Sequence, residues 1–401
     1  MLASRGRSRR SHRLGFPGCS SRRLESRNAP VIDDAVLLTG FPSPLARAVS
    51  SEVLRADAGA SVFAITRTTA VEEARAYVEA LPVEQRKRVQ LIEGNAGAID
   101  FGLAGVEFRS LARQVTRIHH CAQVTSVSAD RKTCERVNVG GAREALEFAT
   151  SCAKLDCLVF HSTAHVAGDR HGLVLEEELK AGQSFRSVVE ETKGRAEKMM
   201  RSRMDRLPIA VVRPATVVGD SRTGEIERFD GPYLLFLLVV TSPSDLALPL
   251  PGRGDDPLNL VPIDWVARAA VAIGRDRRAR GRTFHLVDPQ PLSVRRVFEL
   301  VARAGGRRAP RGSIPANLAK ALLRAPGLDR IVKSPRAFVE TLTTPVTYDS
   351  RNADELLGSL GVDPCPPLET YVDKLVEYVQ ERTRERRAIK TPPAEIEDPL
   401  V

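Results

Sequence analysis

The chain has 401 residues, of which 42% are hydrophobic and 27% charged, a composition typical of a globular protein with one large or two modest domains. It contains no apolar run of about eighteen residues, so we expect no membrane-spanning helix. Six cysteines without a Cys-x-x-Cys pair argue against a disulfide scaffold and a structural zinc site. We therefore expect no bound metal and a reducing, cytoplasmic location.

The net charge of +10 is concentrated at the N-terminus, because residues 1–30 hold eight Arg, no Lys and one acid, Glu25. We interpret 1–30 as a basic disordered tail, a start placed too far upstream or a transit peptide. The remaining chain is almost neutral, so we expect no nucleic-acid partner. Residues 388–401 contain three prolines and are expected to form a flexible tail.

Short apolar runs alternate with amphipathic stretches from Val31 onward. The runs predict strands at 36–38, 61–66, 89–92, 117–122, 156–162, 209–213 and 283–287. The stretches between them predict helices at 45–54, 71–81, 131–152 and 188–203. Such alternation implies right-handed crossovers and a parallel sheet, so the expected fold is a doubly wound α/β Rossmann sheet.

Residues 31–290 form the expected Rossmann domain, with a cap insertion at about 225–258. Four further helical stretches, at 293–306, 315–324, 334–342 and 368–387, predict a smaller helical substrate-binding cap over 291–387. Residues 229–240 and 246–251 are strongly apolar. These two runs either line a pocket for an acyl chain or pack the core of the cap.

The turn after the first strand is a candidate phosphate-binding loop that leads into a helix. A dinucleotide needs a tight turn, close backbone approach and a helix N-terminus pointing at its phosphates. Only Gly40 of three expected glycines is present, with Ser43 at the second position and Ala46 at the third. The segment is either such a loop or an ordinary strand-turn-helix connection.

The end of the second strand bears on the choice of cofactor. A carboxylate there would bind the ribose diol of NAD, but Arg67 stands in its place and no acid follows until Glu72. A cation suits a 2′-phosphate, which favours NADP and leaves NAD possible. Arg67 is otherwise a solvated loop residue.

From Val36 to about Arg387 the chain resembles the extended short-chain dehydrogenase/reductases, and within them the male-sterility branch. That branch is also called NAD-binding domain 4 and includes fatty acyl-CoA reductases and thioester reductase domains. Six stretches carry the resemblance in order: Thr39-Gly40-Phe41-Pro42, Ile118-His119-His120-Cys121-Ala122, Asn138-Val139-x-Gly141, Phe160-His161-Ser162-Thr163-Ala164, Arg213-Pro214-x-x-Val217-Val218-Gly219-Asp220-Ser221 and Asn259-Leu260-Val261-Pro262-Ile263-Asp264.

The resemblance implies hydride transfer between a nicotinamide cofactor and a small carbonyl or acyl substrate. It also implies a set of cofactor-binding residues: Gly40, Phe41, Pro42, Ser43, Leu45, Arg67, Asn95, Ala122, Asn138, Lys193, Pro214 and Val217. Family members often form dimers, so a homodimer is possible.

The resemblance implies three catalytic positions, of which one is altered. Thr163 and Ser162 match the hydroxyl that binds the substrate carbonyl, and Lys193 matches the lysine of the family's Tyr-x-x-x-Lys pair. The tyrosine position, however, is Val189. Loss of a positioned general acid typically lowers the rate about 10²- to 10⁴-fold.

Three functions remain open on these residues. The first is a reductase of an acyl thioester, aldehyde or ketone, in which water, His165 or Tyr233 from the cap supplies the proton. The second is a catalytically impaired nucleotide-binding sensor or scaffold. The third is a sugar-nucleotide epimerase or dehydratase, which shares the fold but usually needs the same tyrosine.

Overall fold

The computed structural model describes residues 34–126, 129–226, 233–242, 248–323, 339–340 and 342–390. The chain divides into two compact units, and the second, Asp33–Val401, contains all of the described residues. The basic tail expected at 1–30 lies outside the described residues, as do most of the helix predicted at 334–342 and residues 391–401 of the C-terminal tail.

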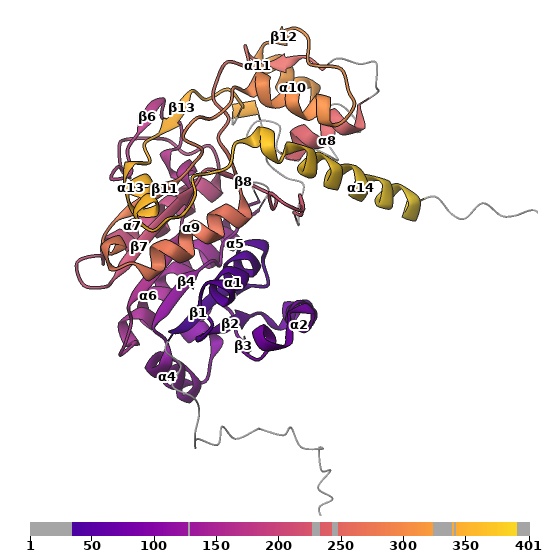
Figure 1. Cartoon of the computed structure of the whole chain (residues 1–401). Coiled ribbons are helices and arrows are strands. Elements are labelled where there is room, and N and C mark those ends of the chain that lie inside the picture. The colour runs from indigo at the N-terminus through magenta and orange to yellow at the C-terminus, as the bar shows by residue number, and fades with distance from the viewer. Residues whose placement is uncertain are drawn as a thin grey trace, which may run out of the picture. The chain divides into compact units, whose positions relative to one another are not determined.

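Seven parallel strands form the central sheet, in the order β3-β2-β1-β4-β5-β7-β11 (Figure 1). Their bounds are Asp34–Phe41 (β1), Ala60–Thr66 (β2), Val89–Glu93 (β3), Arg117–His120 (β4), Cys157–His161 (β5), Ile209–Pro214 (β7) and Thr283–Leu286 (β11). All seven predicted strands are confirmed. The strand order reverses between β1 and β4, and ligands of doubly wound sheets bind outside the carboxyl ends of the strands at this point.

The central strands read as nearly continuous apolar runs because both faces of the sheet are covered. All five residues of β5 are buried, as are seven of the eight residues of β1. Neighbouring histidines on β4 show the two faces, since successive side chains point to opposite sides of a strand. His119 lies against Gly274 of helix α9 (Ile263–Arg275), and His120 lies against Gly141 of helix α6 (Gly141–Ser151).

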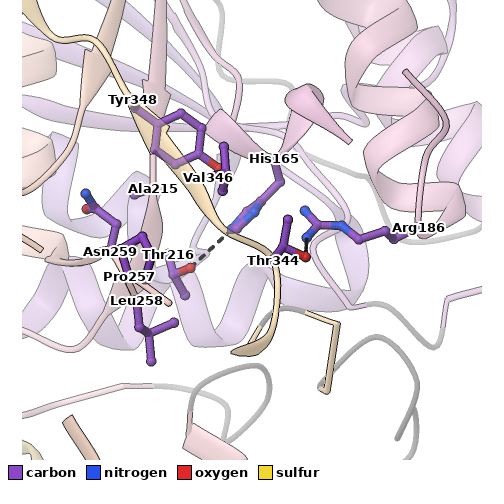
Figure 2. Close-up of a pocket in the computed structure, with 10 residues that line it drawn as sticks. All are labelled: His165, Arg186, Ala215, Thr216, Pro257, Leu258, Asn259, Thr344, Val346 and Tyr348. Carbon is purple, nitrogen blue, oxygen red and sulfur yellow. Dashed lines mark hydrogen bonds between the residues drawn. The ribbon is translucent and has the colours of Figure 1, made fainter. Parts of the chain in front are cut away.

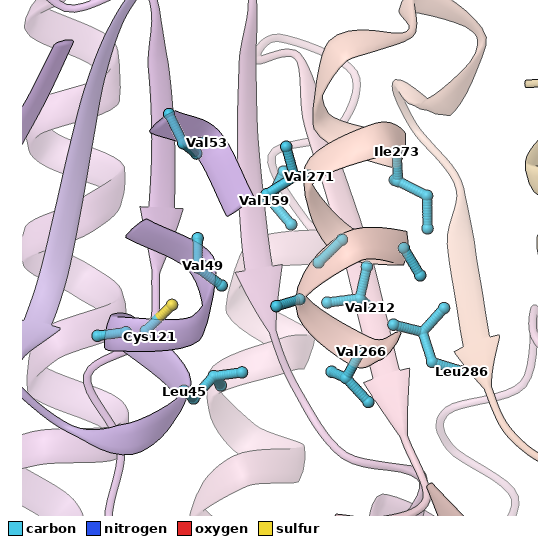
Figure 3. Close-up of a cluster of buried hydrophobic side chains, with 14 of the residues drawn as sticks. Leu45, Val49, Val53, Cys121, Val159, Val212, Val266, Val271, Ile273 and Leu286 are labelled. Atoms are coloured by element: carbon cyan, nitrogen blue, oxygen red, sulfur yellow. The ribbon is translucent and has the colours of Figure 1, made fainter. Parts of the chain in front are cut away.

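Helices α1 (Pro44–Ala56) and α9 cover one face of the sheet (Figure 3). Their apolar sides meet Val159 of β5 and Val212 of β7 in one buried cluster. On the other face α6 packs against α4 (Gly105–Gln114) and α7 (Val188–Arg201). Helix α7 starts at Ser187, whose hydroxyl accepts a hydrogen bond from the backbone N–H of Glu190, a standard N-terminal cap.

A second hydrophobic core holds the cap together. It joins α8 (Tyr233–Thr241), α10 (Val294–Ala304) and α14 (Val372–Lys390). Tyr233 and Phe236 of α8 are fully buried in this core, against side chains such as Val297. The inserted segment and the C-terminal segment therefore build one apolar cluster, and the apolar run of α8 packs the interior of the cap.

The chain returns to the sheet after the cap. Strand β13 (Val346–Tyr348) pairs with β6 (Gly172–Val174), and α13 (Arg351–Ser359) places Leu356 and Leu357 in the same apolar cluster as α1 and α9. This differs from the predicted organisation, which assigned all of 291–387 to the cap. The buried carboxylate of Glu176 fixes the return, because it accepts the backbone N–H groups of Asn352 and Ala353.

The remaining elements are short connections. They are α2 (Val71–Ala80), α3 (Val83–Arg86), α5 (Arg131–Cys134), α11 (Ala316–Leu322), β8 (Thr216–Val218), β9 (Leu250–Pro251), β10 (Leu260–Pro262), β12 (Ser313–Ile314), the π-helical turn η3 (Glu135–Gly140), and the 3-10 turns η1 (Thr68–Ala70), η2 (Ile99–Gly102), η4 (Ala164–Ala167), η5 (Arg277–Ala279) and η6 (Leu368–Thr370). None of the helices in the described part of the chain has both the length and the apolar character needed to cross a bilayer.

Candidate active site

The turn between β1 and α1 depends on Gly40. Its φ is +82°, and a Cβ at this position would lie 2.6 Å from the Cα of Ala122. Only glycine allows both the left-handed backbone and this contact. Gly40 and Ala122 therefore bring the carboxyl ends of β1 and β4 together at the reversal point of the sheet, where both were predicted to adjoin a cofactor.

The N-terminus of α1 fits a phosphate group. Ser43 precedes the helix and Pro44 is its first residue, so the positive end of the helix dipole faces the turn. The Ser43 hydroxyl is buried, and the described residues offer it no hydrogen-bond partner. A dinucleotide pyrophosphate would supply an acceptor for this hydroxyl and for the first free N–H groups of the helix.

Phe41, Pro42 and Leu45, the other predicted residues of this loop, have side chains that are buried beneath the turn. Phe41 and Leu45 are buried in the main core, where the Phe41 ring meets Tyr77 edge-on with 5.6 Å between ring centroids. Pro42 is buried as well. These three side chains are positioned to support the turn, whereas Gly40 and Ser43 present backbone and hydroxyl at its surface.

Arg67 follows the last residue of β2 and is exposed. Among the described residues its guanidinium has no ion pair and no hydrogen-bond partner. Neighbouring Thr68 donates its hydroxyl to Glu93 at 2.6 Å. Arg67 is thus available to a ligand at the carboxyl end of β2.

Two predicted contact residues farther along the chain, Asn95 and Asn138, already form local hydrogen bonds. The Asn95 amide oxygen accepts the N–H of Gly97 at 3.0 Å, which makes it part of its own turn. The Asn138 amide joins two elements: its oxygen accepts the N–H of Val124 at 2.8 Å, and its nitrogen donates to Thr192 of α7 at 3.0 Å. Asn138 therefore ties the loop after β4 to the helix that carries Lys193.

Pro214 and Val217 lie where β7 passes into β8. Pro214 is the last residue of β7 and is buried, whereas Val217 is half-buried in β8. Both border the segment that lines the cavity described below.

The two predicted hydroxyls after β5 have different surroundings. Thr163 is half-buried, and its hydroxyl accepts the N–H of His165 at 3.3 Å. The Ser162 hydroxyl instead donates to Glu197 at 2.6 Å. Glu197 forms a buried ion pair with Arg213, with 2.5 Å between Oε1 and Nη2. The Ser162 hydroxyl is therefore part of a buried hydrogen-bond network, whereas the Thr163 hydroxyl bonds only to the neighbouring backbone among the described residues.

Lys193 is held in place by two oxygen acceptors. Its Nζ donates to the carbonyl oxygen of His161 at 2.5 Å and to the side chain of Gln123 at 2.8 Å, and it lies 4.9 Å from the centre of the Phe160 ring. Burial lowers the pKa of Lys193 to about 7, against the opposing influence of Glu197. Val189, one turn earlier on α7, carries no group that can donate a proton.

A narrow cavity with a volume of about 20 Å³ is lined by His165, two residues after Thr163, and by Arg186, three residues before Val189. Its walls come from the segments that follow β5 and β7, the segments that precede α7 and β10, and strand β13 with the residue Thr344 before it (Figure 2). They consist of His165, Arg186, Ala215, Thr216, Pro257, Leu258, Asn259, Thr344, Val346 and Tyr348. Six of these ten side chains carry a polar group, and the small volume suits a single reacting group better than an acyl chain.

Sequence reasoning found only part of this wall. Arg186 lies three residues before Val189, and Thr216 lies within the stretch that begins at Arg213, so both had a local signal. Tyr348 had no such signal, because it lies 159 residues after Val189 and only the folded chain brings its strand to the cavity. Tyr233, considered as a proton donor, instead accepts the N–H of Gly219 at 2.6 Å inside the cap.

Comparison with known sequences identifies the family of the chain. A profile of the male sterility protein family, a group of NAD-binding domains, matches residues 38–270. The chain belongs to this family. It is an extended short-chain dehydrogenase/reductase of the male-sterility type, and at this coarse level its relatives are NAD(P)-binding oxidoreductases.

Two curated relatives illustrate the family. The chain is 28% identical to glycine betaine reductase of Emericella nidulans, over 53% of this chain and 17% of the relative. It is 23% identical to the alcohol-forming fatty acyl-CoA reductase of Simmondsia chinensis, over 57% of this chain and 50% of the relative. The chain thus spans half or less of the length of these two relatives.

Solved structures share the fold. The terminal R domain from the myxalamid biosynthetic pathway superposes with a TM-score of 0.73 at 23% identity, covering 88% of this chain and 91% of that domain. The agreement extends beyond the Rossmann sheet, since the profile match ends at residue 270 and the superposition covers most of the chain.

Proposed function

We propose that the protein is an NADP-dependent reductase that reduces a carbonyl group of an acyl thioester, aldehyde or ketone. The observation that carries the proposal is the position of Lys193. Its ammonium group bonds to the carbonyl of His161, two residues before Thr163, at the carboxyl end of β5. A small cavity lined in part by His165 and Thr216 adjoins the same end of the sheet.

NADPH, when bound, supplies the hydride. The turn at Gly40 and the N-terminus of α1 bind its pyrophosphate, and Arg67 binds the 2′-phosphate. Lys193 donates to the hydroxyls of the nicotinamide ribose, and the Thr163 hydroxyl donates to the substrate carbonyl. Such a donor stabilises the negative charge that develops on the oxygen during reduction.

The names of the relatives support a substrate whose carbonyl group belongs to a carboxylic acid or an acid derivative. One relative is a reductase of glycine betaine and another reduces fatty acyl-CoA to alcohol. In this chain the apolar run of α8 packs the cap interior, and the cavity has a volume of only about 20 Å³. We therefore favour a substrate with a short acyl group.

A nucleotide-binding protein without turnover is the alternative, and Val189 is the observation that favours it. An epimerase or dehydratase ranks third, because that chemistry also usually needs the missing tyrosine. The first two functions predict the same affinity for NADPH and differ only in chemistry.

The test uses the purified full chain. Calorimetry with NADPH and NADH measures binding, and the absorbance of NADPH at 340 nm follows turnover with acyl-CoA thioesters, aldehydes and ketones of increasing length. Binding with turnover supports the reductase. Binding without turnover on every substrate supports the alternative, and failure to bind either nucleotide refutes both.

A further inference from the structure

The fold accounts for the position of the Tyr348 ring but gives no partner to its hydroxyl among the described residues. Its ring packs against His285 with 5.4 Å between ring centroids, which anchors it to the last strand of the sheet. Its other end lines the cavity together with His165 and Arg186 (Figure 2). Its hydroxyl has no hydrogen-bond partner among the described residues, although the residue is mostly buried.

The cavity that Tyr348 lines is bordered by residues close in sequence to the two positions that matter for carbonyl reduction. His165 follows Thr163 by two residues on the segment leaving β5, and Arg186 precedes Val189 by three residues. The pairing of β13 with β6 brings Tyr348 to this place, since Tyr348 stands opposite Val174. The C-terminal segment thus supplies a phenol to the cavity that Arg186 also lines, three residues before Val189, where α7 lacks the family's tyrosine.

The other candidate donors of the cavity region are unsuited to the task. Burial, reinforced by Arg186, lowers the pKa of His165 to about 3, so its ring is neutral near pH 7. The His165 Nε2 also shares a hydrogen bond of 3.2 Å with Thr216. Arg186 is engaged by Glu190, with 3.1 Å between the charged groups.

We propose that Tyr348 is the proton donor of the reduction and takes over the role of the phenol absent at Val189. This inference rests on the proposed reductase function. The carbonyl carbon gains the hydride, the C=O π bond breaks, and its electron pair on oxygen takes the proton of the Tyr348 hydroxyl. NADPH is oxidised to NADP⁺, and water returns a proton to the phenolate.

The acidity of the group is compatible with this step. Burial raises the pKa of Tyr348 to about 12, and the nearby cation of Arg186 opposes the rise. The hydroxyl is therefore protonated near neutral pH. An alkoxide is a base of about the strength of hydroxide and far stronger than a phenolate, so transfer of the proton from the phenol to the alkoxide is downhill.

The test compares Tyr348→Phe with the wild type and with Tyr378→Phe, a control on α14 that does not line the cavity. Phenylalanine keeps the ring on His285 and removes only the hydroxyl. We expect kcat of Tyr348→Phe to fall about 10²- to 10⁴-fold with NADPH affinity unchanged, and Tyr378→Phe to keep wild-type kcat. Adding Val189→Tyr to Tyr348→Phe is expected to restore part of the activity.

A second measurement does not depend on turnover. Butanamide carries a carbonyl oxygen but is not reduced, and its affinity for the NADPH complex is measured by calorimetry. Loss of one hydrogen bond predicts about three- to tenfold weaker binding to Tyr348→Phe. If Tyr348→Phe turns over as fast as the wild type and binds butanamide equally well, the inference is wrong, but the reductase function stands. A wild type that reduces nothing, yet binds butanamide through Tyr348, refutes the reductase and keeps the hydroxyl as a carbonyl-binding group.

Discussion

Replacing Lys193 with methionine should stabilise the folded protein near neutral pH. Lys193 is 3% exposed, and burial lowers its pKa from 10.5 to about 7. Between pH 7 and pH 10.5 the unfolded chain binds a proton that the folded protein does not. The buried lysine therefore lowers the free energy of unfolding by its full amount below pH 7, and this penalty disappears as the pH rises through 10.5. At pH 7 the penalty is about 4 kcal/mol.

Methionine also removes two hydrogen bonds, to His161 and Gln123, each worth about 1 kcal/mol. The net expectation for Lys193→Met is therefore a gain of about 2 kcal/mol at pH 7. By pH 10 this gain should fall by about 3 kcal/mol and become a small loss. The folded lysine is then neutral while the unfolded lysine, with a pKa of 10.5, is still mostly protonated, which leaves a penalty of only about 1 kcal/mol. A functional residue held at the expense of stability is a common trade-off.

Urea unfolding at pH 7, 8.5 and 10 measures this difference, with Lys198→Met, an exposed position on the same helix, as the matched control. Comparing each variant with the wild type at the same pH cancels the titration of all other groups. The reasoning fails if Lys193→Met is less stable than the wild type at pH 7, or if its difference from the wild type does not change with pH.

Three further variants and one control test the cofactor site and its support. Arg67→Ala should weaken NADPH about 10- to 100-fold, the value of one charged hydrogen bond, and leave NADH unchanged in calorimetry; equal losses would remove the role of the 2′-phosphate. Gly40→Ala should lower stability by at least about 2 kcal/mol and abolish NADPH binding. Gly306→Ala, at φ +64° in open space, should show the backbone strain alone, and equal losses in both would argue against a clash at Gly40. Glu197→Gln leaves Arg213 buried without its partner and should lower the unfolding free energy by about 3–5 kcal/mol; a change below 1 kcal/mol in urea would show the pair to be dispensable.

The sequence determined the sheet and the family. Each strand of the sheet is a compact apolar run bounded by turn residues, and burial on both faces gives such runs their pattern. The turn at Gly40 was also readable, because a left-handed residue between strand and helix calls for glycine. Helix α9 had the signal as well: its buried residues recur with helical spacing from Trp265 to Ile273, although no helix was predicted there.

Tertiary structure alone decided the surroundings of the reacting groups. Ser162 and Thr163 are adjacent and chemically alike, yet only the packing of α7 places Glu197 beside Ser162. The apolar run of α8 fits a tunnel or a core equally well until its neighbours in the cap are known. Tyr348 reaches the cavity through the pairing of β13 with β6. Local periodicity reports only which face of an element is buried, whereas contacts between segments far apart in the sequence, by 35 residues for Ser162 and Glu197 and by more than a hundred for Tyr348 and Val174, depend on how the whole chain packs.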